Sequence, residues 1–190
     1  MIDNSRLCRL WDRRWPDSQP RADRLRHAHP SRWLRFHSLP GSKRYPTSED
    51  EYATVLHRHK TVIDELADDA NLFLITCGWG ETQQPGRRDE RLSALDPAGV
   101  FWHALPPDDY DELWTYLYAS QVRWSRGLLD PVLRAVADGL LGGVMIAASD
   151  LSWIYHPSDG GADVLLPTSE QRDQLRGHHR DWLSVHPAGL

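Results

Sequence analysis

Apolar and polar side chains alternate, or gather in short apolar runs, in several segments of strand length. Trp114, Tyr116 and Tyr118 repeat with period two, and residues 71–77 (NLFLITC) form an apolar run between Asn and Gly. Alternation predicts a half-buried strand, whereas a short apolar run predicts a strand that is buried on both faces. The predicted strands are 33–37, 71–77, 99–105, 113–124, 144–148 and the two halves of 152–166.

Apolar residues recur three or four positions apart in three other segments, which we expect to be helices. The first begins at Ser48, whose capping box with Glu51 favours a helix start, and runs to Leu66. The second covers 127–141 and is ended by a Gly pair, and the third covers 169–184. Because helices and strands do not alternate regularly, we expect an α+β fold. Its mostly antiparallel sheet would hold about five or six strands and be covered by three helices.

Charge is distributed unevenly along the chain. Residues 1–46 hold 11 Lys and Arg against four Asp, although the whole chain has a net charge of −5. We therefore expect a basic, partly ordered N-terminal arm at 1–31, with a short helix near 5–14, and a single α+β domain at 32–190. Such an arm could attract nucleic acid, but no nucleic-acid-binding motif is present. We expect the arm to fold back onto the acidic remainder of the chain.

Composition excludes several classes of protein. Nine Trp residues are several times the usual share, which indicates an aromatic-rich core or binding surface. No apolar run approaches the roughly 20 residues that span a bilayer. The first residues are Arg-rich where a signal peptide would be apolar. Cys8 and Cys77 form no metal-binding or disulfide pattern. We expect a cytoplasmic protein with no membrane partner and no cofactor.

A basic loop precedes the first predicted helix. Lys43 and Arg44 lie in LPGSKRYP, where two cations before a helix start suggest an anion site. Phosphate loops use several glycines so that backbone N–H groups converge, whereas Pro40 and Pro46 remove such donors here. A solvated turn is the favoured interpretation, and Lys43 and Arg44 are kept as candidate binding residues.

The stretch 152–166 (SWIYHPSDGGADVLL) gathers polar groups around a predicted turn. A two-residue turn at Asp159-Gly160 would place His156 directly opposite Asp163, so that the carboxylate could fix a histidine tautomer for acid–base catalysis. A longer loop would instead pair Tyr155 with Asp163, which favours a structural hydrogen bond. His156, Asp163 and Tyr155 are therefore the candidate catalytic residues, and a stabilising cross-strand contact is the favoured interpretation.

Metal binding is not indicated. The sequence has 10 His, but it lacks the local patterns of His and carboxylate residues that are typical of metal sites. His178 and His179 are adjacent, so on a helix their side chains point about 100° apart and chelate one ion poorly. We expect no metal site.

Two motifs near the end of the chain carry a resemblance. WIYHPSDGGADVLL contains a Tyr-His, Asp-Gly, Asp-Val hairpin, and HHRDWLSVHP contains an Asp-Trp-Leu closing helix. Over the last forty residues the chain resembles an uncharacterised bacterial domain family. The resemblance implies a small bacterial α+β protein of unknown activity, and proteins of this kind are sometimes considered immunity or interaction proteins. The matching residues are Tyr155, His156, Asp159, Gly160, Asp163, Asp181 and Trp182.

Three functional hypotheses follow. The first is a non-enzymatic protein-binding domain of a regulatory or immunity type, supported by the Trp content and by the lack of a catalytic signature. Its candidate binding residues, besides the basic loop, are Trp153, Asp159, Asp181 and Trp182. The second hypothesis is a small hydrolase or metal-assisted enzyme around His156 and Asp163. The third is nucleic-acid binding by the arm. The oligomeric state is left open.

Overall fold

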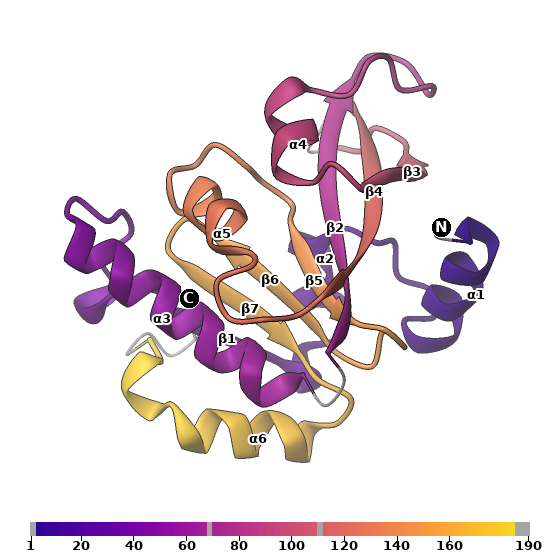
Figure 1. Ribbon diagram of the computed structural model, residues 1–190. Coiled ribbons are helices and arrows are strands. Elements are labelled where there is room, and N and C mark those ends of the chain that lie inside the picture. Colours follow the sequence, from indigo (N-terminus) through magenta and orange to yellow (C-terminus); the bar gives the residue numbers. More distant parts are fainter. Residues whose placement is uncertain (1–2, 68–69, 110–111, 185–190) are drawn as a thin grey trace.

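The computed structural model describes residues 3–67, 70–109 and 112–184. One antiparallel sheet with the order β1-β7-β6-β5-β2-β4-β3 forms its centre (Figure 1). The predicted α+β class is confirmed, and the sheet is larger than expected because all the predicted strand segments join it. The strands are β1 (Trp33–His37), β2 (Asn71–Gly80), β3 (Val100–Leu105), β4 (Trp114–Arg123), β5 (Met145–Ala148), β6 (Ile154–Ser158) and β7 (Gly161–Leu165).

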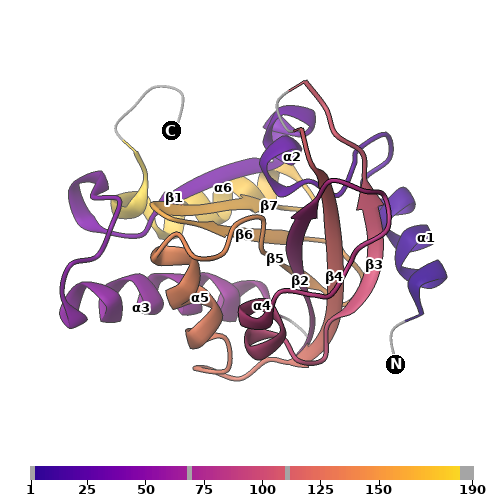
Figure 2. The ribbon, with the colours of Figure 1, turned by 90° about the horizontal axis from the view of Figure 1, so that it is seen from above.

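Helices cover both faces of the sheet. The described residues form six α-helices, whereas three covering helices and a short helix near 5–14 were predicted. Figure 2 shows α3 and α5 on one side of the sheet and α2 on the other. The α-helices are α1 (Asn4–Arg14), α2 (Ala22–Ala28), α3 (Glu49–Leu66), α4 (Glu90–Leu95), α5 (Asp130–Ala137) and α6 (Ser169–His178). Short 3₁₀ turns occur at Pro30–Arg32, Pro40–Ser42 and Arg180–Trp182.

The main core lies between the sheet and the layer of α3, α5 and α6. Val62 and Ile63 of α3, Leu133 of α5 and Leu175 of α6 pack there against the strands. Helix α3 begins as predicted, since the Ser48 side chain accepts a hydrogen bond from the Glu51 N–H. Its four buried residues form one stripe, which is the face that amphipathic spacing predicts.

Helix α4 was not predicted, because the region between the second and third strands reads as a long loop. The helix is short, and it begins at a cap: the side chain of Asp89 accepts a hydrogen bond from the Leu92 N–H. An ion pair then fixes the segment, with Arg88 Nη2 at 2.9 Å from Asp96 Oδ2, and the Asp96 side chain is only 2% exposed. The region is therefore ordered by a buried contact that spacing does not reveal.

The N-terminal arm holds α1 and α2, which form a second core with the opposite face of the sheet. Leu7, Trp11 and Trp15 are buried there, and Trp15 Nε1 donates to the Leu151 carbonyl oxygen at 3.0 Å. Arg14 pairs with Asp150, as an arm that folds back onto acidic residues requires. The short helix near 5–14 corresponds to α1, and the division into an arm and a domain stays a prediction.

The last predicted helix is shorter than expected. Helix α6 ends at His178, and Asp181 and Trp182 lie in the 3₁₀ turn that follows, not on a continuous helix. None of the helices that the structure describes is both long and apolar enough to cross a membrane.

Candidate functional site

The β6–β7 hairpin adopts the first of the two predicted registers. His156 lies opposite Asp163 and Ser158 lies opposite Gly161, so Asp159 and Gly160 alone form the turn. A Cβ atom at Gly161 would lie 2.1 Å from the Phe36 carbonyl oxygen, so only glycine fits where the hairpin meets β1. The register therefore places His156 and Asp163 on the same face of the sheet.

His156 is buried and held by the backbone. Its Nδ1 lies 2.8 Å from the Val144 carbonyl oxygen, and the residue is only 8% exposed. Because a carbonyl oxygen can only accept, Nδ1 carries the hydrogen and Nε2 keeps a free lone pair in the neutral ring. Burial lowers the pKa of His156, against the opposing effects of the Val144 carbonyl and the Asp163 carboxylate. The neutral ring is thus the form present at pH 7.

Asp163 is bound to another residue. Arg35 of β1, which lies opposite Asp163 on the other side of β7, donates from Nη1 to Asp163 Oδ1 at 3.1 Å. The Asp163 side chain is 4% exposed and that of Arg35 is 18% exposed. The carboxylate therefore neutralises a partly buried guanidinium, and no hydrogen bond joins it to His156.

Tyr155 lies on the opposite face of the sheet from His156. Its hydroxyl lies 2.6 Å from His59 Nδ1, and Ser38 Oγ lies 3.4 Å from the other ring nitrogen of His59. Burial raises the pKa of Tyr155 and lowers the pKa of His59 to about 4. This buried Ser-His-Tyr network is inside the main core, so Tyr155 does not share a site with His156 and Asp163.

The hairpin turn brings Asp159 and Arg44 together. Asp159 Oδ2 accepts hydrogen bonds from Arg44 Nε at 2.9 Å and from the Tyr45 hydroxyl at 3.0 Å. Lys43 contacts a different partner, the carboxylate of Glu51. Both cations of the basic loop are therefore ion-paired, which weakens the anion-site interpretation.

The other predicted binding residues belong to the main core and its edge. Trp153 is 6% exposed and packs in the core. Trp182 stacks on His179 with ring centroids 4.1 Å apart, and the Arg58 guanidinium lies 5.2 Å from the Trp182 ring. Asp181 is exposed. These residues lie on the face of the sheet that His156 does not share.

A cavity of about 340 Å³ lies between α2 and the sheet, and His156 is the only predicted site residue that lines it. Thr115 and Leu117 of β4 pair across the ladder with Trp79 and Cys77 of β2. Cross-strand partners share a face, so these four side chains form a wall of this cavity. The lining residues are Pro20, Arg21, Ala22, Asp23, Arg24, Cys77, Trp79, Thr115, Leu117, Gly143 and His156.

Cys77 is not an activated nucleophile. Its thiol donates to the Gly143 carbonyl oxygen at 3.1 Å, and burial raises the pKa of the thiol to about 12. Gly143 has φ +66°, and a Cβ atom there would lie 2.7 Å from Cys77 Sγ. The thiol is therefore a protonated part of the cavity wall.

Charged residues at the start of α2, including its N-cap Arg21, border the same cavity and are paired. Arg21 Nη2 donates to the Pro106 carbonyl oxygen at 3.1 Å, and its Nη1 lies 3.5 Å from Asp108 Oδ2. Arg24 bridges Asp23 and Asp108 at 3.2 and 3.3 Å. These guanidinium groups are consequently paired within the protein.

The sequence did not reveal the cavity under α2, because its lining residues become neighbours only when the strands pair and α2 packs on the sheet.

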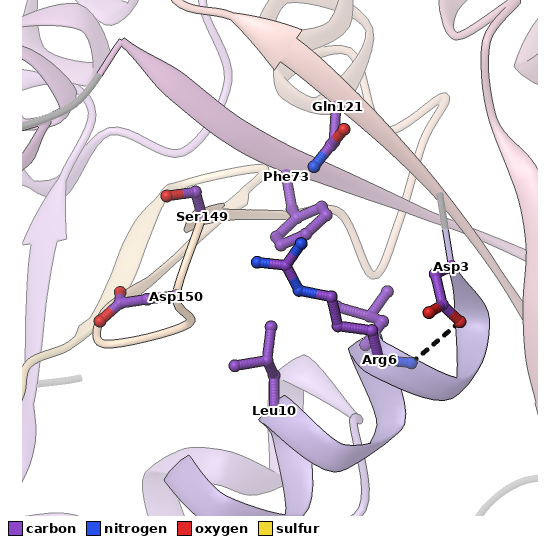
Figure 3. Close-up of a pocket in the computed structure, with 8 residues that line it drawn as sticks. Asp3, Arg6, Leu10, Phe73, Gln121, Ser149 and Asp150 are labelled. Carbon is purple, nitrogen blue, oxygen red and sulfur yellow. Dashed lines mark hydrogen bonds between the residues drawn. The ribbon is translucent and has the colours of Figure 1, made fainter. Parts of the chain in front are cut away.

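A second cavity, of about 270 Å³, lies at the other end of the same sheet face, next to α1. Figure 3 shows Arg6 extending from α1 toward Phe73, with Gln121 and Ser149 beside it. Asp150 also lines it and is bound by Arg14. Nowhere in residues 3–67, 70–109 and 112–184 do three metal-ligating side chains gather in a group that could hold an ion.

Comparison with known proteins gives one match. Residues 21–187 match a family described as a domain of unknown function (DUF3885), which supports the resemblance to an uncharacterised domain family. The expectation that the match is limited to the last forty residues is wrong, since it begins at Arg21. No curated protein and no solved structure matches the chain. Apart from Pro20, the residues that line the cavity under α2 lie within the matched region, whereas α1 lies outside it.

Proposed function

The chain belongs to the DUF3885 family, and from that premise we propose that it is a non-enzymatic binding protein of a regulatory or immunity type. Its partner is a second protein, which docks at the mouth of the cavity under α2. The observation that carries this proposal is Trp79, which lines the cavity and is nevertheless 48% exposed. A large, half-exposed aromatic side chain beside a cavity is typical of the centre of a protein interface.

Other exposed apolar residues accompany Trp79 at this end of the sheet. Leu113 directly precedes Trp114, the strand partner of Gly80, and is 38% exposed. Leu140 is 49% exposed and lies just before Gly142, where a Cβ atom would be 3.5 Å from the Trp79 ring. Apolar side chains gathered beside Arg residues match the composition of interface centres.

The test uses Trp79→Ala, with Tyr45→Ala as a matched control because Tyr45 is also 48% exposed. Each variant and the unchanged protein would be expressed in the native host, cross-linked, purified and analysed by mass spectrometry. We expect a protein partner whose recovery falls by about tenfold in Trp79→Ala and stays unchanged in Tyr45→Ala. Equal recovery of every cross-linked protein from both variants would contradict the proposal.

Catalysis is a second candidate function, and one observation favours it. The Val144 carbonyl fixes the tautomer of His156, so Nε2 is a base that could accept a proton from water or substrate. Asp163 then positions the strand through Arg35 and does not orient the imidazole. A hydrolytic activity of the purified protein that is lost in His156→Gln with unchanged folding would support this second function.

Nucleic-acid binding by the arm has less support. Arg14, Arg21 and Arg24 all contact carboxylates of the same chain, so less positive charge is left for phosphates. The other predicted binding residues, the bacterial source and the cytoplasmic location stay predictions.

A further inference from the structure

Thr115 leaves a buried hydroxyl group unpaired in the wall of the cavity under α2. The residue is 5% exposed and lines the cavity, and its Oγ1 has no hydrogen-bond partner among the described residues. A buried polar group without a partner costs free energy, so a ligand group that binds Oγ1 gains a hydrogen bond without breaking a contact of the protein. The hydroxyl therefore marks a point where the cavity favours a hydrogen bond to a ligand.

Trp79 lies beside this hydroxyl and offers an apolar surface. Trp79 and Thr115 are direct partners in the β2–β4 ladder, so their side chains leave the same face of the sheet with Cβ atoms about 5 Å apart. The indole packs against a glycine pair, since a Cβ atom at Gly142 or Gly143 would lie 3.5 or 4.0 Å from the ring. Trp79 is nevertheless 48% exposed. One ligand side chain can therefore contact both the indole and the hydroxyl.

The charges around the cavity balance, which favours an uncharged ligand group. Arg21 and Arg24 pair with Asp108. Arg24 also pairs with Asp23, so two guanidinium groups meet two carboxylates. Burial lowers the pKa of His156, and its ring is neutral at pH 7. A charged group that entered the cavity would lose its hydration beside groups that are already paired or neutral.

We propose that the cavity under α2 receives a tyrosine side chain of the bound protein. Its ring packs on the Trp79 indole, and its hydroxyl forms a hydrogen bond with Thr115 Oγ1. This inference rests on the proposed function and specifies the chemistry of the partner. A tyrosine combines a large apolar ring with one hydroxyl, which matches the indole and the unpaired hydroxyl of the wall.

Other uncharged side chains match these two groups less well. Phenylalanine would cover Trp79 and leave Thr115 Oγ1 unpaired. Tryptophan only donates, so the hydrogen of the Thr115 hydroxyl would lack an acceptor, whereas a phenol can both donate and accept. Glutamine carries two N–H donors and a carbonyl oxygen, which is more than one hydroxyl can satisfy.

The experiment measures binding of small side-chain probes by NMR. Protein labelled with ¹⁵N would be titrated with Nα-acetyl-tyrosinamide while the indole N–H signal of Trp79, assigned by its loss in Trp79→Ala, is observed. The corresponding phenylalanine, lysine and glutamate amides serve as comparison probes. We expect the tyrosine probe to shift the Trp79 signal in a saturable manner and to bind about fivefold more tightly than the phenylalanine probe. The lysine and glutamate probes should cause no saturable shift.

Two variants test the contact with Thr115. Thr115→Val removes the hydroxyl at nearly constant shape, so the tyrosine and phenylalanine probes should bind it equally. An unchanged affinity for the phenylalanine probe shows that the cavity is still formed. Ser120→Ala is the matched control, since Ser120 is also on β4, is 1% exposed and has an unpaired Oγ, but pairs with Leu74 of the main core. It should keep the fivefold preference for tyrosine.

Several outcomes would overturn the inference. Equal affinities for the tyrosine and phenylalanine probes in the unchanged protein, or a preference for tyrosine that persists in Thr115→Val, would remove the contact with the hydroxyl. Tighter binding of the lysine or glutamate probe would make the cavity a site for a charged group. An absent response to the tyrosine probe, with partner recovery still lost in Trp79→Ala, would refute the tyrosine inference and leave the proposed function standing. A normal tyrosine response with recovery unaffected by Trp79→Ala would refute the proposed function, and with it the assignment of the tyrosine to a protein partner.

Discussion

His156 lies directly opposite Asp163 in the β6–β7 ladder, yet each side chain is held by a different partner. The imidazole binds the Val144 carbonyl oxygen at 2.8 Å, and the carboxylate binds Arg35 at 3.1 Å. A His–Asp pair that is opposite in register but not hydrogen-bonded lacks the orienting contact of a catalytic dyad. The two residues therefore have separate roles: Asp163 neutralises Arg35, and His156 lines the cavity under α2.

We expect Asp163→Asn to lower the free energy of unfolding by about 3 kcal/mol, because it leaves the Arg35 guanidinium uncompensated in a mostly buried position. Urea denaturation followed by circular dichroism measures the change. Asp173→Asn is the control, since the Asp173 side chain is 60% exposed and its pair with Arg172 contributes little. Equal changes in the two variants would show that the Arg35 pair is not structural.

Tyr155→Phe should destabilise the protein by about 1–3 kcal/mol, since it leaves His59 Nδ1 buried without its partner. Tyr45→Phe removes a hydroxyl that is bound to Asp159 at the surface and should have a smaller effect. Chemical denaturation of both variants checks the difference. A larger loss in Tyr45→Phe would contradict the importance of the buried network.

Stability should fall in mildly acidic solution because of His59. Burial lowers its pKa from 6.5 to about 4, so between these values the unfolded chain binds the proton and the folded protein does not. The stability that neutral His59 contributes is fully present above pH 6.5 and is lost as the pH falls toward 4. The slope of the free energy of unfolding is at most about 1.4 kcal/mol per pH unit. Burial acts in the same direction on His156.

Urea midpoints between pH 7 and pH 5 test this dependence. The unchanged protein should lose stability over this interval, and His59→Gln, which keeps an acceptor for Tyr155, should lose less. An identical slope in the two proteins would assign the acid sensitivity to other groups.

Trp15→Ala should reduce stability by about 3–5 kcal/mol, although Trp15 precedes the region that matches the family. Its side chain is fully buried, and the Arg32 guanidinium lies 4.1 Å from its ring. Trp79→Ala, at a half-exposed position, should cost much less. A thermal unfolding comparison separates the two, and a small effect of Trp15→Ala would mean that the arm is not part of the core.

Local patterns predicted the elements well and their arrangement less well. Period-two alternation identified β1 and β4, and the Ser48 capping box identified the start of α3, because these signals depend on neighbouring residues. The order of the strands, the docking of α2 and the helix α4 depend on contacts between distant segments. No spacing rule shows that Trp15 donates to the Leu151 carbonyl oxygen.

The same limit applies to the site. The turn residues Asp159 and Gly160 allowed two registers, and the structure has the one that sets His156 opposite Asp163. Nothing in the local sequence indicated that Val144 and Arg35 would bind those side chains, or that Thr115 would share a cavity with His156.

The buried Cys77 thiol gives the protein a built-in reporter of access to the cavity under α2. A thiol with a pKa of about 12 reacts slowly with alkylating reagents near neutral pH, and Cys77 is only 8% exposed in the cavity wall. Its labelling rate therefore reports how freely a reagent enters the cavity, with the less buried Cys8 as an internal reference. A partner that closes the cavity would slow the labelling of Cys77, so its occupancy could be followed by mass spectrometry without attaching a probe.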